Sequence, residues 1–207
     1  MEKAYRTIKN EAKDEFVEKK SRFIGYAKPV KTQEEAVAFI SQIKQKHWDA
    51  THNVSAYVLR DQHIQRSSDD GEPSGTAGVP VLDVLLKEEL VDVCVVVTRY
   101  FGGILLGAGG LIRAYSHGSK IAVDAAKIIT MAPCSLLSLT VEYSFYDRLN
   151  VLLNDFSANV EKSEFGENVS VTFSLNEKSV SAFQNQLTQK SNGKYNAAII
   201  GEKFAEV

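Results

Sequence analysis

A regular alternation of strand and helix patterns in residues 137–204 constrains the fold more than any other feature of the chain. Apolar residues at every second position indicate strands, and apolar residues at helical spacing indicate helices. The strand patterns cover 137–143, 160–165, 169–175 and 195–204, and the helix patterns cover 146–156 and 180–187. The resulting order, βαββαβ, is the signature of a ferredoxin-like domain, in which two helices cover one face of a four-stranded antiparallel sheet.

The first half of the chain has a different, mixed pattern. Residues 91–98 are largely β-branched and apolar on both faces, which is typical of a central strand that is buried on both sides. Thr32 opens a helix, because Thr-Gln-Glu-Glu matches a capping box in which Glu35 reaches back to the helix start. The remaining patterns predict strands at 5–18, 21–27 and 53–60 and helices at 80–86 and 111–128.

The expected fold class is therefore α+β, with a mixed α/β domain followed by a ferredoxin-like βαββαβ domain. Proline does not continue a helix, so Ala132 and Pro133 mark the predicted boundary after the long helix. We expect the two domains at residues 1–133 and 134–207.

Charge limits the classes of partner. The chain carries 24 Lys plus Arg and 26 Asp plus Glu, and its net charge of -2 excludes a generally basic, histone-like nucleic-acid binder. Residues 1–135 contain 18 basic and 17 acidic residues, and residues 136–207 contain 6 and 9, so the two parts carry +1 and -3. Any contacts with phosphate are expected from the first part, because Lys and Arg neutralise phosphates.

Several absences in the sequence predict a cytoplasmic protein. No apolar stretch approaches the roughly 18 residues that indicate a membrane-spanning helix. The first twenty residues contain five acidic residues and no apolar core, so neither a secretory signal nor a transit peptide is expected. Cys94 and Cys134 form no metal-ligand spacing, and both are expected to be small core residues.

A glycine-rich segment follows the predicted central strand and precedes the long helix. Glycines let a backbone approach a partner closely, and successive amides at a helix start can bind an anion such as phosphate or a carboxylate. Arginines at both ends can add bidentate donors. The alternative is that the glycines only permit a tight connection. The candidate ligand-binding residues here are Arg99, Gly102, Gly103, Gly107, Gly109, Gly110 and Arg113.

An acidic turn provides a second group of candidates. Asp69, Asp70 and Glu72 place three carboxylates in four residues around Gly71. Such carboxylates are retained by full solvation, by cation pairing or by a metal such as magnesium, although the spacing matches no EF-hand loop and no metal site is predicted. One interpretation is a solvated turn at Asp70-Gly71. The other is that the acids pair with Arg99 or Arg113 across a cleft and orient those side chains.

His52 stands at the start of a predicted strand. It is a candidate base or ligand contact, but a histidine in this position is also typical of a structural hydrogen-bonding group. The serines near the two segments lack a nucleophile-elbow pattern, so no catalytic residues are assigned.

Motifs in these segments resemble the IMPACT/YigZ family. They are DDGEPSGTAG at 69–78, RYFGG at 99–103, LGAGGL at 106–111 and RAY at 113–115, with KKSRF at 19–23 and ATH at 50–52 as further similarities. The resemblance implies a first domain with the fold of the second domain of a ribosomal small-subunit protein. It also implies a second domain like the last domain of elongation factor G. It supplies no catalytic residues and no cofactor.

The resemblance also implies a role linked to translation. Eukaryotic members modulate the translational stress response with an additional RWD domain, for which this chain has no room, so that partner is not expected here. Our first hypothesis is a non-enzymatic protein that contacts the ribosome, RNA or a translation factor through the glycine-rich loop. The alternative is a metal-dependent hydrolase or transferase that acts on a phosphorylated small molecule. A third possibility is that both segments only brace the fold.

Overall fold

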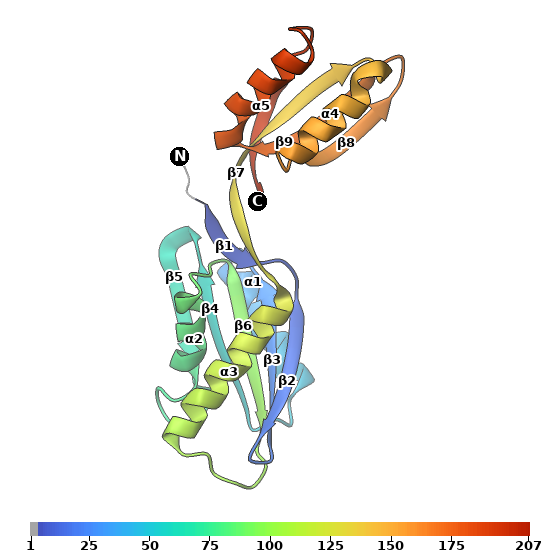
Figure 1. Cartoon of the computed structure of the whole chain (residues 1–207). Coiled ribbons are helices and arrows are strands. Elements are labelled where there is room, and N and C mark those ends of the chain that lie inside the picture. Colours follow the sequence, from blue (N-terminus) through green and yellow to red (C-terminus); the bar gives the residue numbers. More distant parts are fainter. Residues whose placement is uncertain (1–3) are drawn as a thin grey trace. The chain divides into compact units, whose positions relative to one another are not determined.

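The computed structural model describes residues 4–207, and its internal contacts divide the chain into two compact units (Figure 1). The first comprises Tyr5–Ile129 and the second is built on Thr130–Val207. Both units combine a sheet with helices, which confirms the expected two-domain α+β class. None of the helices in this described part is long and apolar enough to cross a membrane.

The N-terminal unit contains an antiparallel sheet in the order β2-β3-β6-β4-β5. The five strands of this sheet are β2 (Ala12–Glu18), β3 (Ser21–Pro29), β4 (His52–Leu59), β5 (Ile64–Ser68) and β6 (Val93–Tyr100). A further strand, β1 (Tyr5–Ile8), precedes them in the chain and is not part of this sheet. The prediction of a central strand is confirmed, because β6 lies between β3 and β4 and is buried from Val93 to Arg99.

Helices cover both faces of this sheet (Figure 1). The helices are α1 (Gln33–Lys46), α2 (Gly78–Lys87) and α3 (Ala108–Ala126), with a short 3-10 helix η1 (Asp61–His63). Val93, Val95 and Val97 pack in a core with residues of α2 and α3, whereas Cys94 and Val96 pack with α1. The alternation along β6 therefore separates two cores, one on each face of the sheet.

The predicted strand over residues 5–18 is wrong as a single element. The chain breaks into β1 and β2 because the amides of Lys9 and Asn10 turn to the end of α3 and donate hydrogen bonds to the Ala126 carbonyl. The last carbonyls of a helix need such partners. The short edge strand β5 was not predicted.

Two predicted helix boundaries also differ. α3 begins at Ala108 and ends at Ala126, where Lys127 takes a φ of 62°, and Pro133 lies inside the following strand instead of ending the helix. α2 begins at Gly78, so Pro80 is its third residue. The start of α1 is as predicted, since the Thr32 hydroxyl accepts the Glu35 amide at 3.2 Å, while the Glu35 carboxylate accepts the Lys31 amide.

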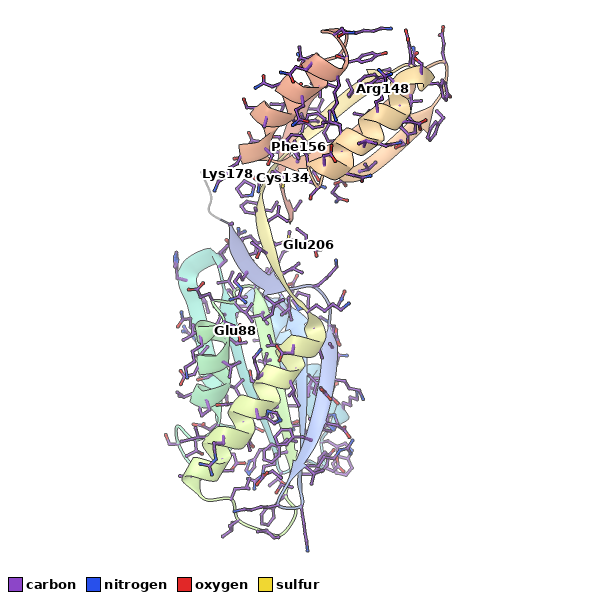
Figure 2. The ribbon with its side chains drawn as sticks, in the orientation of Figure 1. Glu88, Cys134, Arg148, Phe156, Lys178 and Glu206 are labelled. Carbon is purple, nitrogen blue, oxygen red and sulfur yellow. The ribbon has the colours of Figure 1, made fainter. Side chains whose placement is uncertain are left out.

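The C-terminal unit confirms the predicted βαββαβ order. Its elements are β7 (Ile128–Val141), α4 (Tyr143–Asp155), β8 (Asn159–Phe165), β9 (Val169–Asn176), α5 (Glu177–Lys190) and β10 (Ala198–Glu206). Antiparallel pairing gives the order β10-β7-β9-β8. Both helices pack on one core with β7 and β9. Phe156, labelled in Figure 2, lies at the end of α4. Its ring packs edge to face against that of Phe183 in α5, with 5.6 Å between the ring centroids.

Candidate functional site

The two segments singled out in the sequence meet in the N-terminal unit and line one pocket of about 440 Å³. One wall is the loop between β5 and α2, and the other is the loop from β6 into α3. The lining residues are Thr51, His52, Gly71, Glu72, Pro73, Arg99, Phe101, Leu105, Leu106, Gly107, Ala108 and Leu111.

A buried ion pair forms the polar part of this pocket. Arg99 Nη1 donates to Glu72 Oε1 at 2.6 Å, and the two residues are only 5% and 8% exposed. The predicted pairing of an acid with an arginine is therefore confirmed for Glu72 and Arg99. The Arg99 guanidinium also lies over the rings of Phe23 and Phe101, and its Nε has no hydrogen-bond partner in the described structure.

The strands explain why an arginine is buried here. Arg99 lies two residues beyond Val97 on β6, so it extends the row of side chains that faces α2 and α3. Its register partners are Phe23 on β3 and His52 on β4. A charged side chain in such a row needs a counter-charge, which Glu72 supplies from the facing loop.

Tyr115 is a second partner of Glu72. Its hydroxyl donates to Glu72 Oε1 at 2.7 Å from the buried face of α3. Burial, followed by this hydrogen bond to a carboxylate, raises the pKa of Tyr115, so the hydroxyl remains a donor at neutral pH. Tyr115 is not among the site residues predicted from the sequence, although it stands in the RAY motif. The signal that would have identified it is its place on the apolar stripe of the helix.

His52 is held in one orientation beside this cluster. Its Nδ1 lies 2.8 Å from the carbonyl oxygen of Asp70, and because a carbonyl only accepts, Nδ1 carries the proton. In the neutral ring Nε2 then has a free lone pair, and it lies 3.7 Å from Glu72 Oε1. His52 is thus both structurally anchored and part of the pocket lining.

Asp69 and Asp70 do not line the pocket with Glu72. Asp70 accepts the Asn53 amide at 2.7 Å and the Lys44 ammonium at 2.5 Å. Asp69 accepts three backbone amides, from Gly75, Ala77 and Gly78, at 2.8 to 3.1 Å. The interpretation of this turn as a freely solvated one is wrong, because all three carboxylates have protein partners.

The three carboxylates have separate partners and do not converge on one point. Among residues 4–207, with the uncertain side chains set aside, no group of three or more His, Cys, Asp or Glu is placed to hold a metal ion.

The carboxylate of Asp69 caps the start of α2, because it accepts the amides of Ala77 and Gly78 there. This contact predicts the effect of Asp69→Asn. Burial opposes ionisation, but the amides of Gly75, Gly78 and Ala77 together lower the pKa of Asp69 below its ordinary value of 3.8. The charged form therefore contributes stability above pH 3.8, and that contribution is lost as the pH falls through the lowered pKa. We expect Asp69→Asn to cost about 1–3 kcal/mol at pH 7.

Urea denaturation at a series of pH values measures this effect. The deficit of the Asp69→Asn variant should be largest at neutral pH and should shrink below pH 3.8, the ordinary value for the carboxyl group. A deficit that stays constant across this range contradicts the assignment of the three amide bonds to an ionised Asp69.

The glycines of the loop serve different purposes. An added Cβ at Gly102 would lie 2.0 Å from the backbone of Lys20, so this residue permits close packing of the loop on the β2–β3 turn. Gly103 and Gly107 have φ values of 82° and 71°, which favour glycine. Gly109 and Gly110 lie in the first turn of α3. Gly102, Gly103 and Gly107 therefore have structural causes. Whether the loop also binds an anion stays a prediction.

The start of α3 is left without a side-chain cap. Gly107 occupies the capping position, and no described side chain accepts a hydrogen bond there. Neither the Gly107 nor the Ala108 amide donates a hydrogen bond to another described residue, and both residues are exposed at the edge of the pocket. Backbone amides without a partner at the start of a helix carry a partial positive charge.

Arg113 does not share the pocket with Arg99. It is exposed and lines a neighbouring hollow of about 480 Å³ together with Lys19, Glu18 and His117. The two arginines therefore have different environments, since Arg99 is buried and paired whereas Arg113 faces outward. Although they stand at the two ends of the glycine-rich segment, Arg99 and Arg113 therefore do not line the same pocket.

Comparison with known proteins gives matches in both units. Residues 19–123 match the Impact N-terminal domain, and residues 139–194 match a domain of unknown function (DUF1949). The IMPACT family member YvyE of Bacillus subtilis is 43% identical, with 92% of this chain and 88% of that protein aligned. The IMPACT family member YigZ of Escherichia coli is 34% identical, with 89% and 92% aligned.

A solved structure and a more distant relative extend this result. The crystal structure of a hypothetical protein covers 97% of this chain and 98% of its own, with a TM-score of 0.60 and 30% identity. Protein IMPACT of Xenopus laevis is 34% identical over 44% of this chain and 30% of its own length. The matched first region contains both segments that line the pocket. On the strength of these matches over most of its length, the chain belongs to the IMPACT family.

Proposed function

We propose that this protein is a non-enzymatic, translation-associated regulatory protein that contacts RNA of the translation apparatus. The proposed contact surface is one end of the N-terminal unit, where the β2–β3 turn packs against the loop from β6 to α3 (Figure 1). The family resemblance to translation-linked proteins supports the choice of partner, and the chemistry of this surface supports a nucleic acid.

The observation that carries the proposal is a set of exposed cations beside an exposed aromatic ring. Lys19, Lys20 and Arg113, which we call the basic rim, are exposed and form no ion pair with a described residue. Phe101 is 45% exposed on the adjoining loop. Cations that neutralise phosphates beside an aromatic stacking surface are the usual components of a site for single-stranded nucleic acid.

Arg99 has a different role in this proposal from the one its sequence position first suggested. It is buried and neutralised by Glu72, so it is not available to a phosphate without breaking that pair. Its contribution is to hold the base of the loop on which Phe101 stands. Direct phosphate contacts therefore belong to the basic rim, with the Glu18 carboxylate as the one acidic residue lining the same hollow among the described residues.

Replacing the basic rim with alanines should weaken RNA binding and reduce its salt dependence. Each lost contact with single-stranded RNA lowers the slope of log K against log salt by about 0.7, so three substitutions should lower it by about 2. Fluorescence anisotropy with a labelled single-stranded RNA, together with ribosome cosedimentation across a salt series, measures both effects.

A matched control removes the same charge elsewhere on the unit. Lys13, Lys31 and Lys87 are also exposed, and their triple alanine variant should bind RNA with the slope of the wild type. If the rim and control variants lose affinity equally, net charge alone explains binding and the proposed surface is wrong. If the wild type binds neither RNA nor ribosomes at low salt, the proposed function itself fails.

A further inference from the structure

The pocket beside the basic rim contains polar groups that the protein itself does not use. Glu72 lines the pocket, and its Oε1 takes the hydrogen bonds from Arg99 and Tyr115, whereas Oε2 accepts none from a described residue. Oε2 is also not among the buried side-chain atoms that lack a partner, so it faces accessible space. A carboxylate oxygen held in this way is an acceptor for a cationic donor.

His52 presents a second acceptor close by. Its Nδ1 proton is held by the Asp70 carbonyl, which leaves the Nε2 lone pair on the side of Glu72. Both residues line the pocket. Together they form a place where an ammonium group can donate hydrogen bonds to a carboxylate and an imidazole.

Hydrogen-bond donors line the same pocket. The amides of Gly107 and Ala108 donate to no described residue at the uncapped start of α3, a helix of 19 residues. A helix start favours a carboxylate or another anion. The pocket lining thus includes acceptors at Glu72 and His52 and donors at the start of α3.

Much of the remaining lining is apolar. Phe101, Leu105 and Leu106 from the loop and Pro73 from the facing turn line the pocket. Leu105 is 82% exposed and Phe101 is 45% exposed. Large apolar side chains that are exposed next to each other are typical of a binding surface. Apolar walls with a few oriented polar groups are the usual composition of a small-molecule site, and about 440 Å³ lies within the roughly 300–1,000 Å³ of such sites.

We propose that this pocket binds a free α-amino acid with an apolar side chain. The ammonium group pairs with Glu72 Oε2 and His52 Nε2, the carboxylate with the amides at the start of α3, and the side chain with the apolar walls. Arg99 and Glu72 neutralise each other, so the pocket has no net charge that would attract a dianion or a simple cation. A zwitterion, which also has no net charge, suits such a pocket. The inference uses different polar groups from the basic rim and does not depend on RNA binding.

Isothermal titration calorimetry of the full chain with L-leucine and L-phenylalanine tests the proposal. We expect binding of both, and at least about tenfold weaker binding of N-acetyl-L-leucine and L-leucinamide, each of which lacks one of the two charges. Glycine, which lacks the side chain, should bind at least about tenfold more weakly as well. If neither amino acid binds at concentrations up to about 10 mM, the proposal is overturned. It is also overturned if the two blocked derivatives bind as tightly as L-leucine.

Two variants locate the site without disturbing the ion pair. Ala108→Pro removes one of the proposed donors, and proline is tolerated at this first helical position, so affinity should fall about tenfold while the melting temperature is kept. Leu105→Ala changes a side chain that is 82% exposed and should weaken L-leucine severalfold. Unchanged affinity in both variants places any binding elsewhere and overturns the assignment. Alanines at the basic rim should leave amino-acid affinity unchanged, which separates this result from the RNA test.

Discussion

Replacing Arg99 with leucine is expected to lower the free energy of unfolding by about 3–5 kcal/mol, because it leaves the Glu72 carboxylate buried without its cation. Arg99 is 5% exposed and its Nη1 lies 2.6 Å from Glu72 Oε1. Tyr115 would remain as a partner, but a single neutral donor does not compensate a buried charge. Glu72→Leu should cost a similar amount, since it leaves a buried guanidinium.

The double variant distinguishes a paired charge from simple loss of packing. Removing both partners removes the uncompensated charge, so Arg99→Leu with Glu72→Leu should be much less destabilised than the sum of the single variants. Urea denaturation of the four proteins measures the coupling. As a control, Arg22 pairs with Glu15 at 2.7 Å on the surface, and Arg22→Leu should cost about 0–1 kcal/mol. Additive costs at Arg99 and Glu72 would contradict the pairing.

Gly102→Ala is expected to have the second large effect, a loss of about 3 kcal/mol or more. A Cβ at this position would lie 2.0 Å from the carbonyl carbon and oxygen of Lys20. These are backbone atoms, so the contact is relieved only by moving the loop away from the β2–β3 turn. The cost is therefore expected at or above the upper end of the about 1–3 kcal/mol that is typical of overpacking. The hydrogen bond from the Gly102 amide to Ser21 would be lost as well.

Gly109→Ala is the matched control in the same loop-to-helix region. The nearest atom to an added Cβ is the flexible Arg113 Nη1 at 3.6 Å, and the backbone there is helical. Alanine should therefore raise stability by about 0.4–1 kcal/mol. Thermal unfolding of both variants compares them directly. Equal effects of the two substitutions would show that the contact with Lys20 does not limit this position.

The elements that were predicted correctly are those whose burial repeats along the chain. β6 and the βαββαβ segment have regular apolar spacing, because each element buries one face or both faces against the same core throughout. β5 was missed because it is an edge strand with mostly exposed residues. Its sequence, IQRSS, therefore lacks regular apolar spacing. The break between β1 and β2 was missed because its cause is the end of α3, more than a hundred residues away.

In the candidate site, residue types were predictable and their roles were not. Asp69, Asp70 and Glu72 are chemically similar neighbours, yet one caps a helix, one ties a strand to a lysine and one pairs with Arg99. One sequence signal was available: the period of two along β6 places Arg99 in the buried row with Val95 and Val97. It predicts that Arg99 needs a counter-charge but does not select the carboxylate.

By itself the amino-acid sequence determined the two units, their order of elements and the two segments that form the pocket. These depend on local spacing, capping and family motifs, which short stretches of chain contain. Tertiary structure alone decided that Glu72 faces Arg99, that Arg113 lies in a different hollow, and that Glu72 and the start of α3 line the same pocket. The physical reason is that these positions depend on how strands and helices pack over sequence separations of 27 residues and more, which no local pattern encodes.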